Sequence, residues 1–577
     1  MGMSTMTSRW QLNASYTTEE VKQKLESLQQ ELDRFETVEA PIRSQLVTLE
    51  QLMCQVEELS DFVYCLYAED VSRQEVLDLL EQTDTLQASL QTGETLFEER
   101  LRTLSNDEWT VLQHKEAFYY LTERRAIMER RLPAEQEQLI QALAVDGFSA
   151  WEQLYEQRLT GLRLPLNGAT VTIGQAWHQA VHGATRIDRQ TAAAAIAKTC
   201  AAAQDDFAMI LNRIAGFRLQ VYAKRGWDDL LTELCEQNRI KRPTIEAMLT
   251  AIDQHRPLFQ SYYERKLRLA QITEPQWHDL ETNTFKSDRT VSYATAQTII
   301  LKQFEDLHPR LATFTKHVFE AGWVDAENRP NKAEGGFCAS FPVLKESRIF
   351  MTYREAYQDV VTLAHELGHA YHNSLMHDLP FLEQIKGTSI AETASTFMEN
   401  LVLDAVIEQS AGEEKMAMLE TKINEGLKYV GIVPNMFRFE QRFYSERKQG
   451  PVSSARIAAL MQEEEAGFYG NLLDEAAPFK WICVGHFYDT GKAFYNIPYT
   501  IGYLLSNQLY TRVKQSKAAF SDQFEPLLRA SGRASIEELV EQYLDGEPDA
   551  VTFWQDALEP LRSAIELYLQ ETATLVD

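Results

Sequence analysis

The dominant pattern in this sequence is the spacing of its apolar residues, which recur every three or four positions through most of the chain. Such spacing places them on one face of an α-helix, whereas a half-buried strand alternates at every second residue. The pattern is nearly continuous from about Thr17 to Arg131, and it resumes at about Asp188 and extends to the C-terminus. Capping-box signals for helix starts occur at Thr17–Glu20 and Ser105–Glu108. The sequence therefore predicts a mainly α-helical protein.

Two segments interrupt the helical pattern. Residues 161–175 (GLRLPLNGATVTIGQ) place Asn167-Gly168 between two short apolar runs, which is typical of a tight hairpin turn. Residues 335–353 (GGFCASFPVLKESRIFMTY) contain two β-like runs, which we expect to form a small sheet beside the following helix. We predict a helical N-terminal lobe over residues 1–205, with the small hairpin near 161–175, and a second domain over residues 206–577.

Composition excludes several classes of protein. The chain carries a formal net charge of −29 and no basic stripe interleaved with aromatic residues, so we expect no nucleic-acid partner. Its six cysteines are scattered without a CxxC pair, which argues against thiolate metal sites and favours a reducing compartment. The N-terminus lacks a basic region followed by an apolar run, and no run approaches about 18 apolar residues. We therefore expect a cytoplasmic protein without a membrane partner.

Residues 360–377 (VVTLAHELGHAYHNSLMH) place four of the chain's twelve histidines in one predicted helix. Helix stability does not explain this composition, because Gly368 in mid-helix costs about 1 kcal/mol relative to alanine. His365 and His369 lie one turn apart, so two imidazole nitrogens can converge on one metal ion. Glu366 is rotated to lie beside that ion, where a carboxylate can take a proton from metal-bound water. The sequence therefore predicts a hydrolytic metal site on this helix.

A catalytic zinc ion takes three protein ligands and leaves one position for water. The downstream candidates for the third ligand are Glu383, Glu392 and Glu399. We favour Glu392, because GTSIAETASTFMEN predicts a new helix that begins near Gly387–Ser389 and returns beside His369. Glu399 would then lie behind the ligands, on the same helix face. The alternative for Glu392 is a structural capping box with Ser389.

Several of these motifs match those of one family. They are HELGHAYH at residues 365–372, Gly387-Thr388, AETAS at 391–395 and MEN at 398–400. Together they resemble the zinc oligopeptidases of the thimet oligopeptidase and oligoendopeptidase F group. GGFCASFP (335–342) is similar to the segment before that family's metal helix. GHFYDTGKAFYNIPYTIGYLLS (485–506) is similar to the segment in which the family places a His and a Tyr that act on the transition state.

The resemblance implies a two-lobed helical metallopeptidase with a deep substrate channel and one Zn²⁺ per chain. The substrates would be short unstructured peptides, cleaved at internal bonds by metal-activated water, and residues 206–577 would form the catalytic domain. His365, His369 and Glu392 take the family's ligand positions, and Glu366 takes the position of the general base.

The resemblance also assigns residues that stabilise the transition state. His486 matches the family's His, and alignment on Gly502 assigns Tyr499 as the Tyr, with Tyr495 and then Tyr488 as alternatives. From the residues alone, a packed aromatic wall is favoured over a set of oxyanion donors for the tyrosines of this segment, and the resemblance reverses this preference. We also consider that the run Ile349–Tyr353 pairs with the substrate backbone as an added strand, with an internal structural strand as the alternative.

Two other functions are compatible with the sequence. A metallocarboxypeptidase of related helical fold would use Arg348 or Arg354 to bind the C-terminal carboxylate of its substrate. A non-catalytic helical peptide-binding protein would hold a structural zinc ion, with His372 as a fourth protein ligand. We favour the open catalytic site, because Glu366 is retained and because His372 faces inward two turns from His365. The sequence does not indicate an oligomeric state.

Overall fold

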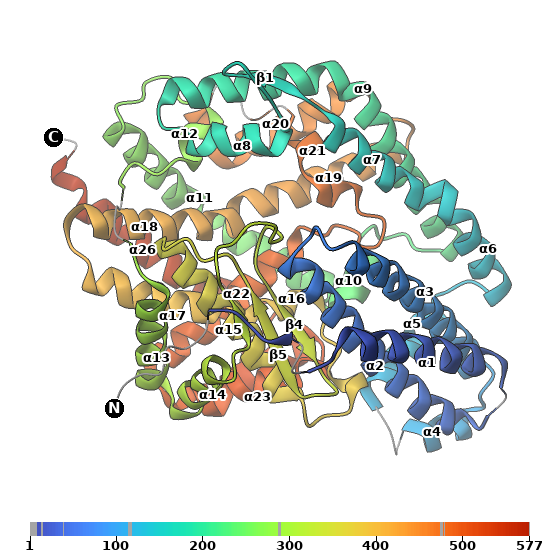
Figure 1. Ribbon diagram of the computed structural model, residues 1–577. Helices are drawn as coiled ribbons and strands as arrows, with labels where there is room; N and C mark the ends of the chain where they lie inside the picture. The colour runs from blue at the N-terminus through green and yellow to red at the C-terminus, as the bar shows by residue number, and fades with distance from the viewer. Residues whose placement is uncertain are drawn as a thin grey trace. The chain divides into compact units, whose positions relative to one another are not determined.

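A computed structural model describes residues 8–12, 15–38, 40–113, 118–286, 290–473, 477 and 479–575 of the chain. These residues are mainly α-helical with small sheets, which confirms the predicted fold class (Figure 1). Residues 1–7, part of the N-terminal segment on which the cytoplasmic prediction rests, lie outside the described residues. Among the described residues, no helix is both long and apolar enough to cross a lipid bilayer.

The chain divides into two compact units, each built from three segments. The first unit comprises Met1–Arg130, Asp288–Val406 and Gln508–Asp545, and the second comprises Arg131–Ser287, Ile407–Asn507 and Gly546–Asp577. The extents of the predicted domains, 1–205 and 206–577, stay a prediction.

The first unit holds the first helices of the chain and the segment around the histidine-rich helix. Its helices are α1 (Thr18–Thr37), α2 (Ile42–Glu69), α3 (Gln74–Arg102), α4 (Asn106–Gln113), α5 (Phe118–Glu129), α13 (Tyr293–Leu307), α14 (Pro309–Glu320), α15 (Tyr357–Met376), α16 (Thr388–Ala391), α23 (Glu525–Ala530) and α24 (Ile536–Leu544). Helices α17 (Thr393–Gln409) and α22 (Ile497–Gln515) each contain a division between the two units.

The second unit is also helical and contains a short hairpin. Its helices are α6 (Ala134–Ala144), α7 (Ala150–Gly161), α8 (Ile173–His182), α9 (Arg186–Arg225), α10 (Thr232–Asn238), α11 (Arg242–Leu269), α12 (Trp277–Glu281), α18 (Gly412–Leu427), α19 (Val433–Arg447), α20 (Ser454–Tyr469), α21 (Lys480–Cys483), α25 (Val551–Ala557) and α26 (Glu559–Glu571). Strands β1 (Leu164–Leu166) and β2 (Ala169–Val171) pair antiparallel. Asn167 and Gly168 connect them with φ of 52° and 81°, the left-handed conformation that a two-residue hairpin turn requires.

A three-stranded sheet lies against the histidine-rich helix in the first unit (Figure 1). Its strands are β3 (Val324–Asp325), β4 (Phe337–Phe341) and β5 (Glu346–Phe350), in the order β3-β5-β4. Strand β5 pairs in parallel with β3 and antiparallel with β4. Beyond β5, the N–H groups of Met351 and Tyr353 donate to the carbonyls of Asp325 and Ala326.

The hypothesis that Ile349–Tyr353 adds a substrate strand is therefore wrong, because this run already pairs within the protein. Strand β4 is an edge strand of the sheet, as β3 is on the other side. The N–H of Ser340 donates to Oδ2 of Asp61 at 2.7 Å, so it faces away from β5. In a strand, backbone groups two residues apart face the same side, so those of Cys338 also face the outer edge.

Helices α1, α2 and α3 share one hydrophobic core with this sheet. Phe62 of α2 packs against Phe341 of β4, and both are fully buried together with Phe350 of β5. Oε2 of Glu58, also on α2, accepts hydrogen bonds from the N–H groups of Val343 and Leu344 in the turn between β4 and β5. The N-terminal helices thus support the sheet that lies next to α15.

Helices α15 and α17 approach each other at Gly368. A Cβ atom on this glycine would lie 2.6 Å from Cα of Ser395 and 2.7 Å from the carbonyl oxygen of Ala394, closer than real Cβ atoms come to other atoms. Both obstacles belong to the backbone of α17, so neither can move aside as a side chain does. The mid-helix glycine therefore has a packing function: it lets the backbone of α17 touch α15.

We expect Gly368→Ala to destabilise the first unit by about 1–3 kcal/mol, the usual cost of overpacking a close contact. Gly174→Ala is the matched control, because a Cβ at Gly174 on α8 would meet nothing within 4 Å. That control should be neutral or gain up to about 1 kcal/mol from helix propensity. Thermal unfolding of both variants measures the difference, and equal midpoints would contradict the tight contact.

Helix α19 in the second unit carries a buried carboxyl group, Glu440, next to the loop that ends at Asn496. Glu440 is 2% exposed, and its Oε2 has no hydrogen-bond partner among the described residues. Burial raises the pKa of Glu440 to about 8, although the charge of Arg218 and a hydrogen bond with the backbone of Phe494 oppose the shift. The protein therefore holds a neutral carboxyl group at this position at neutral pH.

This carboxyl group should make stability fall as pH rises from 6 to 8. The folded state retains the proton up to about pH 8, whereas an unfolded Glu releases it near 4.5, so unfolding releases a proton across this range. Glu440→Gln should remove about 1–2 kcal/mol of this pH dependence, measured as the change in unfolding midpoint between pH 6 and pH 8. Glu264→Gln, at an exposed carboxylate on α11, serves as the control, and an unchanged pH dependence in Glu440→Gln would contradict the assignment.

Candidate functional site

Helix α15 positions the two histidines of the HExxH motif. Its start is capped by Asp359, whose Oδ2 accepts hydrogen bonds from the N–H groups of Arg354 at 2.7 Å and Ala356 at 2.9 Å. One turn separates His365 from His369, and their Nε2 atoms lie 3.1 Å apart. Both side chains are partly exposed, at 21% and 22%.

Glu392 lies at the junction of α16 and α17, as the C-terminal cap of α16. Its Oε2 is 3.5 Å from Nε2 of His365 and 3.5 Å from Nε2 of His369. The hydroxyl of Ser395 donates to the same Oε2 at 3.0 Å and so fixes the carboxylate. The two imidazoles and this carboxylate therefore face one point.

Glu399 lies two turns further along α17 and contacts the other nitrogen of His365. Its Oε1 forms a hydrogen bond with Nδ1 of His365. A proton on Nδ1 leaves the lone pair of Nε2 directed at the shared point, which is the usual arrangement behind a metal-binding histidine.

Glu366 lies beside this group and is 4% exposed. Its Oε2 is buried and has no hydrogen-bond partner among the described residues. The possible ligand atoms of His365, Glu366 and His369 all lie within 4.8 Å of one another. An unpartnered buried carboxylate oxygen calls for a partner of its own, such as a water molecule.

The charges of this cluster reinforce one another. Burial by itself would lower the pKa of His365, but the charge and hydrogen bond of Glu399 outweigh it and raise that pKa to about 9. Burial opposes ionisation of Glu392, but a hydrogen bond from His369 and the charges of both histidines lower its pKa to about 2. Burial raises the pKa of Glu366, and the two histidines only partly offset it. The cluster therefore stabilises positive charge between the imidazoles, whether a proton or a metal ion carries it.

The donor set fits a zinc ion. Two imidazole nitrogens and one carboxylate oxygen form a common catalytic ligand set, which leaves a fourth position for water. His372 does not join it: this side chain is buried, and its Nε2 lies 2.9 Å from Oγ of Ser531 and 3.1 Å from the carbonyl of Leu528. Its inward orientation is therefore as expected, and the structure gives no support to a fourth protein ligand at this position.

The arginines of the carboxypeptidase alternative are placed differently. Arg348 is 5% exposed and donates to Oε2 of Glu346 and Oγ of Ser15 at 2.7 and 2.8 Å. Arg354 is exposed and lies 3.4 Å from the carboxylate of Glu334. Arg348 is therefore already paired within the protein, and neither arginine contacts the histidine cluster in the described hydrogen bonds and ion pairs.

His486, Tyr495 and Tyr499 form a second cluster, in the second unit. The ring of His486 lies 4.8 Å from that of Tyr495 and stacks at 5.8 Å on that of Tyr499. The hydroxyl of Tyr499 donates to that of Tyr495 at 3.2 Å. All three side chains are partly exposed. Tyr488 differs, because it is fully buried and stacks at 3.7 Å on Tyr155, so it belongs to the core.

Asn496 is a residue of this cluster that the sequence reading did not single out. Its Oδ1 lies 2.9 Å from Nδ1 of His486. Asn496 is 2% exposed, and its Nδ2 has no hydrogen-bond partner among the described residues. Its position ten residues after His486 carries no recognisable spacing, so only the folded loop brings the two together.

The chain is similar to several known peptidases. The model of Peptidase family M3 matches residues 182–558. An oligoendopeptidase F homolog of Lactococcus lactis is 23% identical over 365 residues, covering 59% of this chain and 58% of that protein. Oligopeptidase PepF of Bacillus subtilis is 22% identical over 339 residues, covering 57% of this chain and 48% of that protein. The chain thus spans about half the length of these curated relatives.

Solved structures share the fold over nearly the whole chain. A putative peptidase from Chlamydophila abortus has a TM-score of 0.81 at 18% identity and covers 99% of each chain. Oligoendopeptidase-F from Enterococcus faecium has a TM-score of 0.70 at 18% identity, covering 97% of this chain and 100% of that one. Since the family match extends over more than half of the sequence, the chain belongs to peptidase family M3, in agreement with the resemblance of its metal-helix motifs.

Proposed function

We propose that the chain is a zinc-dependent oligoendopeptidase that hydrolyses internal bonds of short unstructured peptides. The observation that carries this proposal is the convergence of His365, His369 and Glu392, whose facing atoms lie within 3.5 Å, beside the buried Glu366. Membership of family M3 supports it, and so do the names of the oligoendopeptidase F relatives. The substrate channel and the cytoplasmic location stay predictions.

His365, His369 and Glu392 would hold one Zn²⁺. When bound, the ion supplies Lewis acidity for the scissile carbonyl and lowers the pKa of water to about 7. Glu399 would hold the ring of His365 in position through Nδ1, and Ser395 would hold Glu392. Both supporting side chains come from α17, which contacts α15 at Gly368.

Glu366 would be the general base. Its unpartnered Oε2 would accept a proton from the attacking water and later donate it to the leaving amine. Burial raises the pKa of Glu366, which brings its basicity closer to that of a group working at neutral pH.

His486 and Tyr499 would donate hydrogen bonds to the carbonyl oxygen as it becomes negative, with Tyr495 as the alternative to Tyr499. Asn496 would set the protonation of His486. If Oδ1 of Asn496 accepts a hydrogen bond from Nδ1–H of His486, the imidazole can donate from Nε2 only in its doubly protonated form. If the amide of Asn496 is rotated, its Nδ2 donates to Nδ1 instead, and a neutral imidazole carries its proton on Nε2 and donates from there. In either orientation Asn496 fixes the imidazole plane.

The outer edge of β4 would bind the peptide backbone. Gly336, just before β4, would place a Cβ 3.4 Å from Oε1 of Glu366, so the edge begins beside the proposed base. Pairing through the backbone groups of Cys338 would give affinity with little dependence on substrate sequence.

Replacement of the base tests the function directly. Glu366→Gln should retain about one zinc ion per chain and lose about 10²–10⁴-fold in kcat/KM, because proton transfer is removed while the ligands remain. Zinc is measured by elemental analysis and activity with a quenched peptide blocked at both ends. Glu383→Gln is the control and should keep both properties, because Glu383 lies on the connecting segment after α15 and pairs with Arg533 at 3.4 Å.

Two results would contradict this proposal. Undiminished activity in Glu366→Gln would exclude the base. Cleavage that requires a free C-terminus would indicate a carboxypeptidase instead of an endopeptidase.

The oxyanion donors can be separated by removing one hydroxyl at a time. Tyr499→Phe should lower kcat by about 10²–10³-fold with little change in KM, the usual cost of a lost oxyanion donor. Tyr495→Phe should have the smaller effect if Tyr499 is the donor, and the order of the two effects decides between them. Tyr488→Phe, in the core, is the control for loss of a hydroxyl, and an equal effect there would contradict the assignment.

A further inference from the structure

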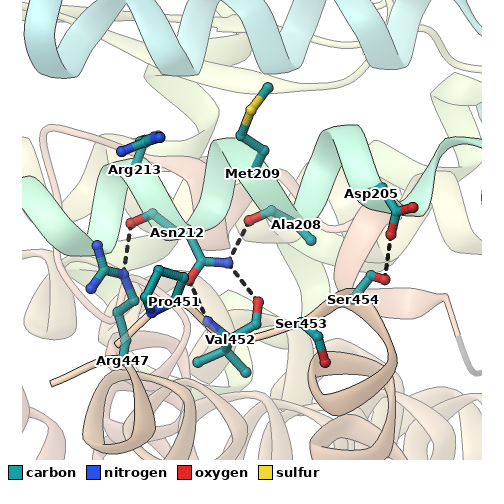
Figure 2. Close-up of a pocket in the computed structure, with 10 residues that line it drawn as sticks. All are labelled: Asp205, Ala208, Met209, Asn212, Arg213, Arg447, Pro451, Val452, Ser453 and Ser454. Carbon is teal, nitrogen blue, oxygen red and sulfur yellow. Dashed lines mark hydrogen bonds between the residues drawn. The ribbon is translucent and has the colours of Figure 1, made fainter. Parts of the chain in front are cut away.

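The second unit contains a pocket of about 310 Å³ between α9 and the segment that joins α19 to α20 (Figure 2). Residues Asp205, Met209 and Arg213 line it from α9, at intervals of four residues and thus along one helix face. Arg447, the last residue of α19, and Val452 of the connecting segment also line it. None of these residues has a part in the proposed peptidase chemistry.

One end of the pocket is cationic. The guanidinium of Arg447 is held by a hydrogen bond from its Nε to the carbonyl of Asn212 at 3.0 Å. It lies across Gly216, where a Cβ would be 2.3 Å from its Nη2, so α9 leaves room for it. Arg213 lines the same pocket and directly follows Asn212, to whose carbonyl Arg447 donates. Among the described residues, neither arginine forms an ion pair with a carboxylate.

The other end of the pocket is acidic. Asp205 precedes Arg213 by eight residues on α9, so their Cα atoms lie about 12 Å apart along the helix axis. Oδ1 of Asp205 accepts a hydrogen bond from Oγ of Ser454 at 2.5 Å. Within the described part of the chain Asp205 has no ion pair, whereas its neighbour Asp206 pairs with Arg158. Asp205 therefore pairs with neither Arg213 nor Arg447 in the described ion pairs.

The middle of the pocket is apolar and its floor is fixed. The side chain of Asn212 donates to the carbonyls of Ala208 and Val452 at 2.7 and 2.8 Å and accepts from the N–H of Val452 at 2.8 Å. These bonds tie the connecting segment to α9 (Figure 2). Met209 is 47% exposed and offers apolar surface between the two charged ends.

We propose that this pocket is a second, non-catalytic binding site for a short peptide with free termini. The peptide carboxylate would bind Arg213 and Arg447, and its ammonium group would bind Asp205. An extended residue spans about 3.3–3.6 Å, so three residues bridge roughly 10 Å, which suits two charged ends about 12 Å apart once the side chains reach inward. The inference rests on the proposed function only for the source of such ligands, because an oligopeptidase releases short peptides with free ends.

Binding of trialanine to the zinc-loaded chain tests the site. Hydrogen exchange should show protection of the amides at residues 447–456, and calorimetry should give a dissociation constant that rises about tenfold or more when either terminus is blocked. Arg213→Gln and Asp205→Asn should each weaken binding about five- to tenfold, through loss of one charged contact. Mass spectrometry of the peptide confirms that it stays intact during the measurement.

Matched controls separate this site from general electrostatics. Asp206→Asn lies next to Asp205 but pairs with Arg158, and Arg163→Gln removes an exposed arginine that bonds to the carbonyl of Leu162. Both should bind trialanine as the unaltered chain does. Equal binding of the doubly blocked peptide, or equal losses in the control variants, would overturn the inference. Protection confined to α15 and α17 would also overturn the inference of a second site, while leaving the peptidase proposal intact. Protection at residues 447–456 without peptidase activity would support the second site and contradict the peptidase proposal.

Discussion

Helices α15 and α17 approach so closely at Gly368 that a methyl group there would overlap the backbone of Ser395. This contact lies at the centre of the histidine cluster. On α15, His365 precedes Gly368 by one turn and His369 follows it directly; across the contact, Glu392 and Glu399 lie one turn before and one turn after Ser395. The carboxylates therefore reach the imidazoles from both sides of a single backbone contact.

The surrounding first unit keeps this contact in place. The sheet contacts α15, with Gly336 before β4 next to Glu366, and the sheet in turn shares a core with α2 through Phe62 and Phe341. Carboxylates at Glu58 and Asp61 accept backbone N–H groups of the β4 strand and its turn. Burial raises the pKa of Asp61 to about 7, although the backbone hydrogen bond from Ser340 opposes this shift. The sequence of the N-terminal helices indicates nothing more than helix, but these helices support the sheet that lies beside the histidine cluster.

Periodicity and turn chemistry allowed most of the fold to be predicted, because they are local. Thr17 and Glu20 form the capping box that their spacing predicts, and Asn167-Gly168 forms the predicted turn. The HExxH spacing likewise placed two histidines together, since one helix turn fixes their separation. The sequence does not show which strands, distant along the chain, pair with each other in the sheet. Strand order decides whether Ile349 is at an edge or in the centre of the sheet, and no local pattern encodes that order.

The same limit applies to Gly368 and Asn496. A mid-helix glycine appears only as a cost in propensity until its partner on α17 is known, and Asn496 appears as one polar residue in a loop until His486 lies against it. Local stability does not explain Gly368, and this marks it as a residue with a long-range role. Asn496 carries no such signal, because an asparagine before a helix is unremarkable as a cap or turn residue.

The acidic residues around the histidines act in two ways at once. Glu392 and Glu399 raise the affinity of the cluster for positive charge, as the raised pKa of His365 shows. Burial is the largest cause of the raised pKa of Glu366. The negative charges of Glu392 and Glu399 raise this pKa further, because they disfavour a negative charge on Glu366. All three carboxylates thus favour positive charge on His365, and Glu366 in addition gains basicity. Their positions differ, because Glu392 and Glu399 contact imidazole nitrogens, whereas Oε2 of Glu366 is left without a partner among the described residues. Three carboxyl groups gathered around two histidines therefore favour both a bound cation and a neighbouring carboxylate of increased basicity.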